Sequence, residues 1–114
     1  MFYLREEQST FATNLAHLIL FANKIGFDVT FGEVKRTKEQ QEIYLKEGKS
    51  LTPNSLHLVS KAADLYFFYH SSGKELTDGN YLNQIGSFWC KLNPKNRAGM
   101  YWSTLIDKNH FEML

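Results

Sequence analysis

Apolar residues recur at helical spacing in two long stretches of the chain. From about residue 7 to residue 24 they form one stripe, which predicts an amphipathic helix. The stripe consists of Phe11, Leu15, Leu18, Ala22 and Ile25. Gly26 follows and predicts the end of this helix, because glycine adopts the left-handed conformation common after helix ends. A second such stretch, about residues 79–92, predicts another helix that ends before Asn93 and Pro94.

Three other segments have the pattern of strands. Residues 28–36 alternate between two faces and are partly β-branched. Residues 62–70 are apolar or aromatic on both faces, which suits a central strand. The tail, residues 98–114, predicts short strands around a loop at residues 107–109.

A short helix and a polar loop separate the first two strands. Thr37 and Gln40 fit a capping box, which predicts a helix from Thr37 to about Glu47. Residues 49–61 are rich in Ser, Thr, Pro and Asn and predict a loop. Three helices and about four strands without regular βαβ alternation indicate a mixed α+β fold, and we expect one domain over residues 1–114.

Composition restricts the classes of partner. With 114 residues and 43% hydrophobic content, the chain has enough apolar side chains for a core. A formal net charge of +1 gives no general reason to expect nucleic acid or a membrane surface as a partner. The single cysteine, Cys90, cannot form an internal disulfide, and we expect it to be a small buried residue next to Trp89.

The first residues do not have the pattern of a secretory signal. Residues 1–4 are apolar, but Arg5 and two glutamates follow at once. The longest apolar-rich stretch, residues 15–22, is too short to cross a bilayer. We therefore expect synthesis in the cytoplasm and no membrane segment.

Two of the four histidines are paired with a carboxylate in the sequence. His17 and His70 are expected at the surface. His57 lies in the polar loop, seven residues before Asp64, which enters the aromatic strand. A carboxylate in such a strand is costly unless something neutralises it, and a metal ion is one such partner. An aspartate that caps a turn at the strand end is the other interpretation.

The second pair lies near the end of the sequence, where Asp107 precedes His110 by three residues. A carboxylate that is close to a metal but not bound to it could accept a proton from water. The alternative is a surface loop with incidental charge. Taken together, the two segments offer two imidazoles, one carboxylate ligand and a spare acid. Three protein ligands leave a fourth position open, as in catalytic zinc sites.

The same residues resemble a peptidase family: the zinc D-alanyl-D-alanine peptidases of the VanX and VanY types, with the phage L-alanyl-D-glutamate endopeptidases. Its signature is Ser-x-His-x-x-Gly-x-Ala-x-Asp, followed later by acid-x-x-His. The matching positions are Ser55, His57, Ala62, Asp64, Asp107 and His110. Upstream, Arg36, Gln41 and Tyr44 are similar to the family's Arg-led helix. Ser60 replaces the usual glycine, and the acid is Asp107 rather than the Glu of some members.

The resemblance implies a Hedgehog/D-Ala-D-Ala peptidase-like fold, with about three helices on a mainly antiparallel sheet. It implies a zinc ion held by His57, Asp64 and His110. It also implies that Asp107 is the general base, that Arg36 stabilises the oxyanion, and that Ser55 orients a ligand or contacts substrate. Gln41 and Tyr44 are expected to support the site or to pack. Glu112 is expected only to orient a neighbour, outside the core set.

The implied substrate is a peptide bond in bacterial peptidoglycan stems or cross-links, cleaved by a monomer. A phage or prophage endolysin-like enzyme fits best, released from the host cytoplasm to act on the cell wall. D-Ala-D-Ala carboxypeptidase, dipeptidase and L-Ala-D-Glu endopeptidase activities share these residues, so the bond stays open.

Two other classes stay open at this point. One is a zinc-binding but inactive module that recognises peptidoglycan. The other is a non-haem iron oxygenase, which also uses two histidines and one carboxylate. The spacing of seven residues between His57 and Asp64, and the helix content, are unlike that second class.

Overall fold

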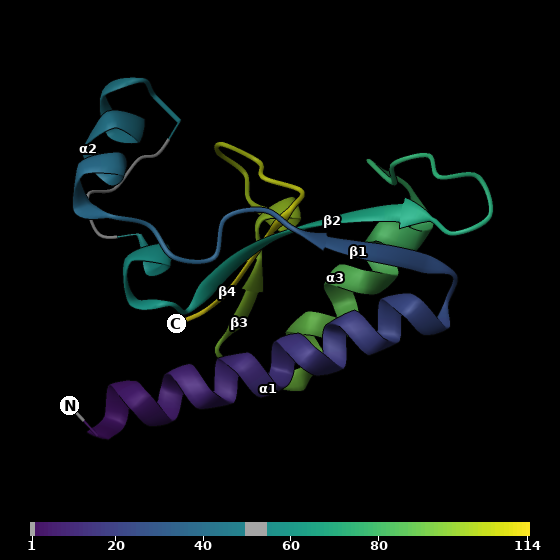
Figure 1. Cartoon of the computed structure of the whole chain (residues 1–114), viewed down its shortest axis with the longest axis horizontal. Helices are drawn as coiled ribbons and strands as arrows, with labels where there is room; N and C mark the ends of the chain where they lie inside the picture. The colour runs from purple at the N-terminus through teal and green to yellow at the C-terminus, as the bar shows by residue number, and fades with distance from the viewer. Residues whose placement is uncertain (1, 50–54) are drawn as a thin grey trace.

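The computed structural model of the chain describes residues 2–49 and 55–114. Four strands form one antiparallel sheet in the order β1-β2-β4-β3. Their bounds are Phe27–Phe31 for β1, Ala62–Tyr69 for β2, Asn96–Ala98 for β3 and His110–Met113 for β4. Two long helices, α1 (Phe2–Lys24) and α3 (Asn80–Leu92), lie together against one face of the sheet (Figure 1). The predicted α+β class, with three helices and a mainly antiparallel sheet, is therefore confirmed.

The hydrophobic core lies between these helices and the sheet. The predicted stripe of α1 faces it, and Leu18 and Ala22 are fully buried. Trp89 of α3 is also fully buried, and its indole nitrogen donates to the carbonyls of Arg97 (3.0 Å) and Glu112 (3.1 Å). Burial of a leucine such as Leu18 stabilises the fold by about 1.5–3 kcal/mol. The Trp89 bonds also hold β3 and β4 in place from the core side.

Strand β2 is central, but only one of its faces is covered. Ala63, Leu65 and Phe67 are fully buried under the helices, whereas Tyr66 is 37% exposed. The predicted central position is confirmed, and one face stays uncovered because α1 and α3 pack on the same side of the sheet. Asp64 lies on the other side, which we call the open face.

Helix α1 begins at Phe2, earlier than the apolar stripe predicts. Its first half contacts the segment before β2: Gln8 Nε2 donates to Val59 O (2.7 Å), and Glu7 pairs with Lys61 (3.2 Å). These contacts are tertiary, so the periodicity of the sequence does not reveal them. No helix in the described ranges has both the length and the apolar character needed to cross a membrane.

Strand β1 ends at Phe31, so the predicted strand over residues 28–36 is too long. The chain still runs beside β2, because Gly32 N donates to Asp64 O (2.7 Å) and Asp64 N donates to Glu33 O (2.8 Å). A Cβ at Gly32 would lie 2.7 Å from the Tyr66 ring, so glycine is required here. This irregular segment carries Glu33 and its neighbours to the end of the sheet where Asp64 lies.

The remaining elements surround that same end. Helix α2 (Lys38–Lys46) has Thr37 as its N-cap, and Thr37 Oγ1 accepts from Gln40 N (3.1 Å), as predicted. The expected loop over residues 49–61 lies partly outside the described residues, and it ends in a 3₁₀ helix, η1 (Leu56–Val59). A second 3₁₀ helix, η2 (Gly99–Tyr101), follows β3, and an irregular loop then leads to β4.

Candidate metal centre

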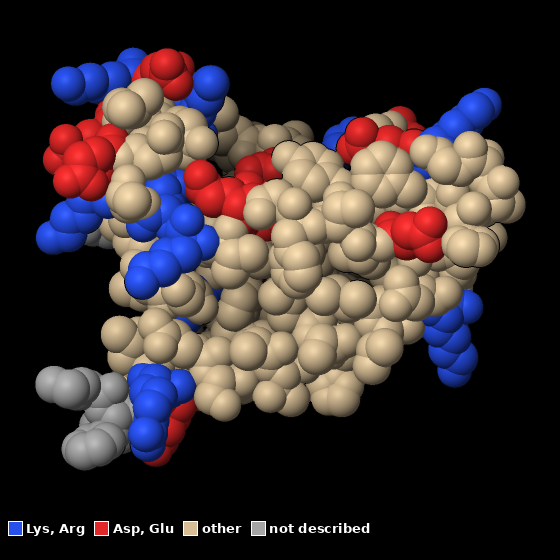
Figure 2. All heavy atoms as spheres, in the orientation of Figure 1, with Lys and Arg blue, Asp and Glu red and all other residues tan. Residues whose placement is uncertain are grey.

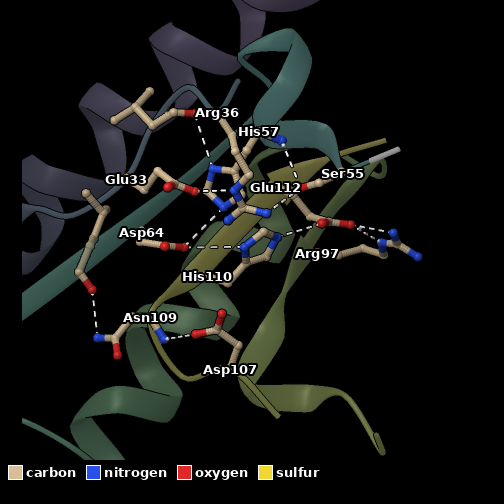
Figure 3. Close-up of polar contacts among 12 residues, drawn as sticks. Glu33, Arg36, Ser55, His57, Asp64, Arg97, Asp107, Asn109, His110 and Glu112 are labelled. Atoms are coloured by element: carbon tan, nitrogen blue, oxygen red, sulfur yellow. Dashed lines mark hydrogen bonds and ion pairs between the residues drawn. The ribbon is translucent and has the colours of Figure 1, made fainter. Parts of the chain in front are cut away.

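The three predicted ligands meet on the open face of the sheet (Figure 3). Asp64 of β2 lies directly opposite His110 of β4 in the antiparallel register, so both side chains leave the same face. His57 comes from η1, whose first turn is capped by Ser55: its Oγ accepts from His57 N (3.2 Å). The structure thus brings His57, Asp64 and His110 together, and their role as metal ligands stays a prediction.

The distances from the two histidine nitrogens to Asp64 match the spacing of ligand atoms around a metal ion. His57 Nε2 and His110 Nδ1 each lie 3.4 Å from Asp64 Oδ1, and the three atoms lie within 4.8 Å of one another. Two donors that are each about 2.1 Å from a tetrahedral zinc ion lie about 3.4 Å apart, whereas charge-assisted hydrogen bonds are shorter, about 2.7–2.9 Å.

Two of these atoms are also buried without a hydrogen-bond partner among the described residues. They are His57 Nε2 and Asp64 Oδ1. Nearly all buried polar atoms in native proteins have a hydrogen-bond partner. These two unpaired atoms therefore call for a further partner. Two imidazole nitrogens and one carboxylate oxygen are ligands that zinc accepts. The residues present therefore fit a zinc ion.

Each imidazole is held through its other nitrogen. His57 Nδ1 donates to Val34 O (3.2 Å), which leaves Nε2 facing Asp64. His110 Nε2 donates to Glu112 Oε1 (2.6 Å), which leaves Nδ1 facing Asp64. Histidine ligands are commonly oriented by such bonds to a carbonyl or a carboxylate.

Mutual electrostatics perturb the acid–base behaviour of the cluster. Burial alone would raise the pKa of Asp64, but the two imidazoles outweigh it and lower that pKa to about 2. Burial would lower the pKa of His110, but Asp64 and Glu112 raise it to about 9. Despite burial, His110 and Arg97 keep the pKa of Glu112 below its ordinary value. Without a metal ion, His110 is therefore protonated at neutral pH.

Arg36 is fixed beside this cluster. Its guanidinium pairs with Glu33, and Nη1 donates to Gln41 Oε1 (2.6 Å) and to Ser55 Oγ (3.3 Å). The guanidinium carbon also lies 4.6 Å from the centre of the Tyr44 ring. Gln41 is 1% exposed, so a buried amide orients the arginine. The expected supporting roles of Gln41 and Tyr44 agree with these contacts, and Glu33 is a partner that sequence reasoning missed.

A cavity of about 710 Å³ opens next to the three ligands. Figure 2 shows the surface hollowed between the region of α2 and the rest of the molecule, with acidic side chains at its edge. The cavity brings together His57, His110, Arg36, Ser55 and Asp107, so the predicted catalytic residues line one space with two of the ligands.

Asp107 reaches this cavity from the loop before β4. Its Oδ1 accepts from Asn109 N (3.3 Å), and Asn109 Nδ2 in turn donates to Leu65 O (2.8 Å). The loop packs directly on Gly99, because Asp107 N donates to Gly99 O (3.1 Å) and a Cβ at Gly99 would lie 2.3 Å from Asp107 O. In the part of the chain that is described, the Asp107 carboxylate bonds to Asn109 and not to the three ligands.

Arg97 is a site residue that the sequence did not assign, and Glu112 was expected only to orient a neighbour, outside the core set. Glu112 is 5% exposed and bonds to both His110 and Arg97. The alternation of β4 offers a signal for Glu112, since residues two apart on a strand share a face.

His17 and His70 are exposed, as expected, and His70 lies against Asp28. Cys90 is only half-buried, packed against the core.

Two known proteins are similar to this chain. No family profile matches the chain. The L-alanyl-D-glutamate peptidase of Listeria phage A118 is 32% identical over an alignment of 100 residues that covers 83% of this chain. The matched part is 34% of that protein, so the chain spans about a third of the length of this curated relative. The crystal structure of the Serratia marcescens L-Ala D-Glu endopeptidase ChiX superposes with a TM-score of 0.69 at 23% identity, covering 96% of this chain and 85% of that one.

Proposed function

We propose that this chain, which is similar to two L-alanyl-D-glutamate peptidases, is a zinc-dependent peptidase acting on bacterial peptidoglycan. The observation that carries the proposal is the convergence of His57, Asp64 and His110, with two buried donor atoms that lack a partner among the described residues. Zinc held there would leave one coordination position open and would supply a Lewis acid that activates water near neutral pH.

The residues around the cavity have complementary roles in this proposal. Asp107 accepts a proton from the attacking water and returns it to the leaving amine, which is general base and then general acid catalysis. Arg36, held by Glu33 and Gln41, donates to the oxygen of the scissile carbonyl as negative charge develops there. Ser55 supports both Arg36 and His57, since its hydroxyl contacts the Arg36 side chain and the backbone of His57.

We propose the bond between L-Ala and D-Glu of the peptide stem as the target, because both similar proteins are named for that bond. Carboxypeptidase action on D-Ala-D-Ala is the alternative within the same chemistry. The similarity to a phage protein also supports a phage or prophage enzyme that acts on the cell wall.

Digestion of purified peptidoglycan by the zinc-loaded protein, with products identified by mass spectrometry, tests this function. We expect fragments with a new amino-terminal Glu, whereas release of free D-Ala would identify a carboxypeptidase. Because general acid–base catalysis contributes about 10²–10⁴-fold, Asp107→Asn should lower kcat/KM by about that factor while zinc stays bound.

Asp28→Asn is the matched control, since Asp28 is an exposed aspartate that contacts only His70 among the described side chains. Its activity should equal that of the wild type. Equal cleavage by the Asp107→Asn protein would remove Asp107 from the mechanism, and cleavage that survives chelation would remove the metal. Zinc binding without any cleavage would favour the inactive peptidoglycan-binding module.

A further inference from the structure

Glu112 is a buried carboxylate beside the three predicted ligands. Its side chain is 6% exposed, and both oxygens have a partner. Oε1 accepts from His110 Nε2 (2.6 Å), and Oε2 accepts from Arg97 Nε (2.9 Å). An ionised carboxylate is costly to bury, so both bonds are needed to hold it there.

The sheet register places these three side chains in a row on the open face (Figure 3). His110 and Glu112 are two residues apart on β4, so they share a face. Arg97 of β3 lies directly opposite Glu112, and its guanidinium lines the cavity with 50% of the side chain exposed. Arg97 is therefore the solvent-facing end of the row, and His110 is the end next to Asp64.

The bond to Glu112 determines which atoms of the His110 ring face the ligand cluster. If the ring turned over, carbon atoms would replace Nε2 at Glu112 and Nδ1 at Asp64, and both contacts would be lost. Packing also restricts the residue, because the Trp102 ring centre lies 4.9 Å from that of His110. Neither Trp102 nor the backbone distinguishes nitrogen from carbon, however, and Glu112 does.

We propose that Glu112, held by Arg97, is a positioning residue that keeps His110 Nε2 protonated and His110 Nδ1 directed at the cluster with His57 and Asp64. This inference rests on the zinc site of the proposed function. It goes beyond that function by assigning the residue that selects the liganding nitrogen.

Two substitutions of Glu112 and one control test the proposal without measuring cleavage. Glu112→Leu removes the acceptor, and Glu112→Gln keeps the shape and one acceptor but removes the charge. Glu7→Gln is the control, since Glu7 is a partly buried carboxylate paired with Lys61 and it contacts none of the three ligands. Zinc affinity is measured by competition with a chromophoric chelator, and folding is checked by thermal denaturation.

Loss of an outer partner of a metal ligand typically weakens metal binding about 10–100-fold, so we expect this loss for Glu112→Leu and a smaller one for Glu112→Gln. Glu7→Gln should bind zinc as the wild type does. Arg97→Gln should weaken binding less than Glu112→Leu, because Glu112 keeps its bond to His110. If Glu112→Leu does not fold, the isosteric Glu112→Gln decides, and unchanged zinc affinity in that variant would overturn the proposal.

Histidine ¹⁵N NMR of the zinc-loaded proteins gives a readout that a purely structural ion pair would not move. We expect His110 to be protonated at Nε2 in the wild type, and to show mixed or reversed protonation in Glu112→Leu. The same Nε2 protonation in both proteins would contradict the inference. A wild-type protein that binds zinc but does not cleave peptidoglycan would count against the proposed function alone, whereas one that does not bind zinc would overturn both.

Discussion

Ser60 shows how one backbone conformation explains a departure from the family signature. It follows η1 with φ 55° and ψ 40°, in the left-handed region. Lys61 N donates to Leu56 O (3.0 Å) across this turn, which joins His57 to β2. The signature has glycine here because glycine adopts this conformation without steric cost. The serine adopts the same conformation, so the turn is kept and only its energy differs.

We therefore expect Ser60→Gly to stabilise the protein. Relief of a left-handed residue is worth about 1–2 kcal/mol, and the greater freedom of glycine in the unfolded chain offsets part of it. The expected gain is up to about 1 kcal/mol in the free energy of unfolding, measured by urea denaturation. Ser71→Gly is the control, since Ser71 has no positive φ and should gain nothing. A lower stability of Ser60→Gly would contradict this account.

The protonation of His110 predicts a pH dependence of metal binding. Asp64 and Glu112 face the ring and raise its pKa to about 9, and His57 is the other titratable group beside it. Below that pH the metal-free protein holds a proton on the liganding nitrogen, and this proton must leave when metal binds. Zinc affinity should therefore fall as the pH is lowered, by about tenfold per unit for one proton.

Calorimetry at pH 7 in two buffers with different ionisation enthalpies measures the number of protons released. We expect about one proton from His110 for each zinc bound. Equal heats in both buffers would show that His110 is already neutral in the metal-free protein.

Among the helices and strands, features that depend on the local sequence pattern were predicted better than features that depend on tertiary contacts. The stripe of α1, the cap at Thr37 and the strand at β2 follow from spacing and from side-chain chemistry along the sequence. The start of α1 and the end of β1 do not, because contacts with distant segments set them. The pattern of β2 predicted its central position but not which face stays open, because apolar or aromatic residues occur on both faces.

The same contrast applies to the site. Motif spacing and the family resemblance predicted the three ligands, Asp107 and Arg36, since each carries its chemistry in its own side chain. Other contacts depend on partners that only folding brings close. Glu33 and Glu112 each pair with a guanidinium, and Arg97 lies opposite Glu112 because of the register between β3 and β4. Sequence spacing alone could not place such pairs.

The loop that carries Asp107 should be sensitive to Gly99. An alanine Cβ there would meet the backbone oxygen of Asp107 at 2.3 Å, so the loop must move. We expect Gly99→Ala to destabilise the protein by about 1–3 kcal/mol and to lower kcat. Gly86→Ala is the contrast, because its Cβ would meet the flexible side chain of Met100. Unchanged kcat in Gly99→Ala would show that Asp107 does not depend on this packing.

At the scale of the molecule, the core and the candidate site occupy opposite faces of one sheet. The helices bury one face, and the other carries the charged cluster with little apolar cover. The core therefore does not depend on the metal, but the ligands come from η1, β2 and β4 and are assembled only in the folded chain. Metal binding should add to a fold that exists without it.

We therefore expect chelation to lower the melting temperature without unfolding the protein at 25 °C. At zinc concentrations about 100 times Kd, binding contributes about 2.7 kcal/mol, which corresponds to roughly 10 °C for a chain of this size. Thermal denaturation followed by circular dichroism, with and without chelator, measures the difference. His110→Ala should show almost no response to chelator. An equal melting temperature of the wild type in both conditions would argue against a site on these residues.

The pairing of Asp64 with His110 makes the metal a test of correct strand alignment. Side chains alternate along β4, so a shift of one residue against β2 would turn Phe111 to the open face and His110 into the core. A misaligned molecule would lose a ligand and bury a polar ring at once. Zinc would therefore bind only to molecules in which β4 pairs with β2 in the correct register. The fraction of metal-loaded molecules would then measure the fraction with correct strand alignment.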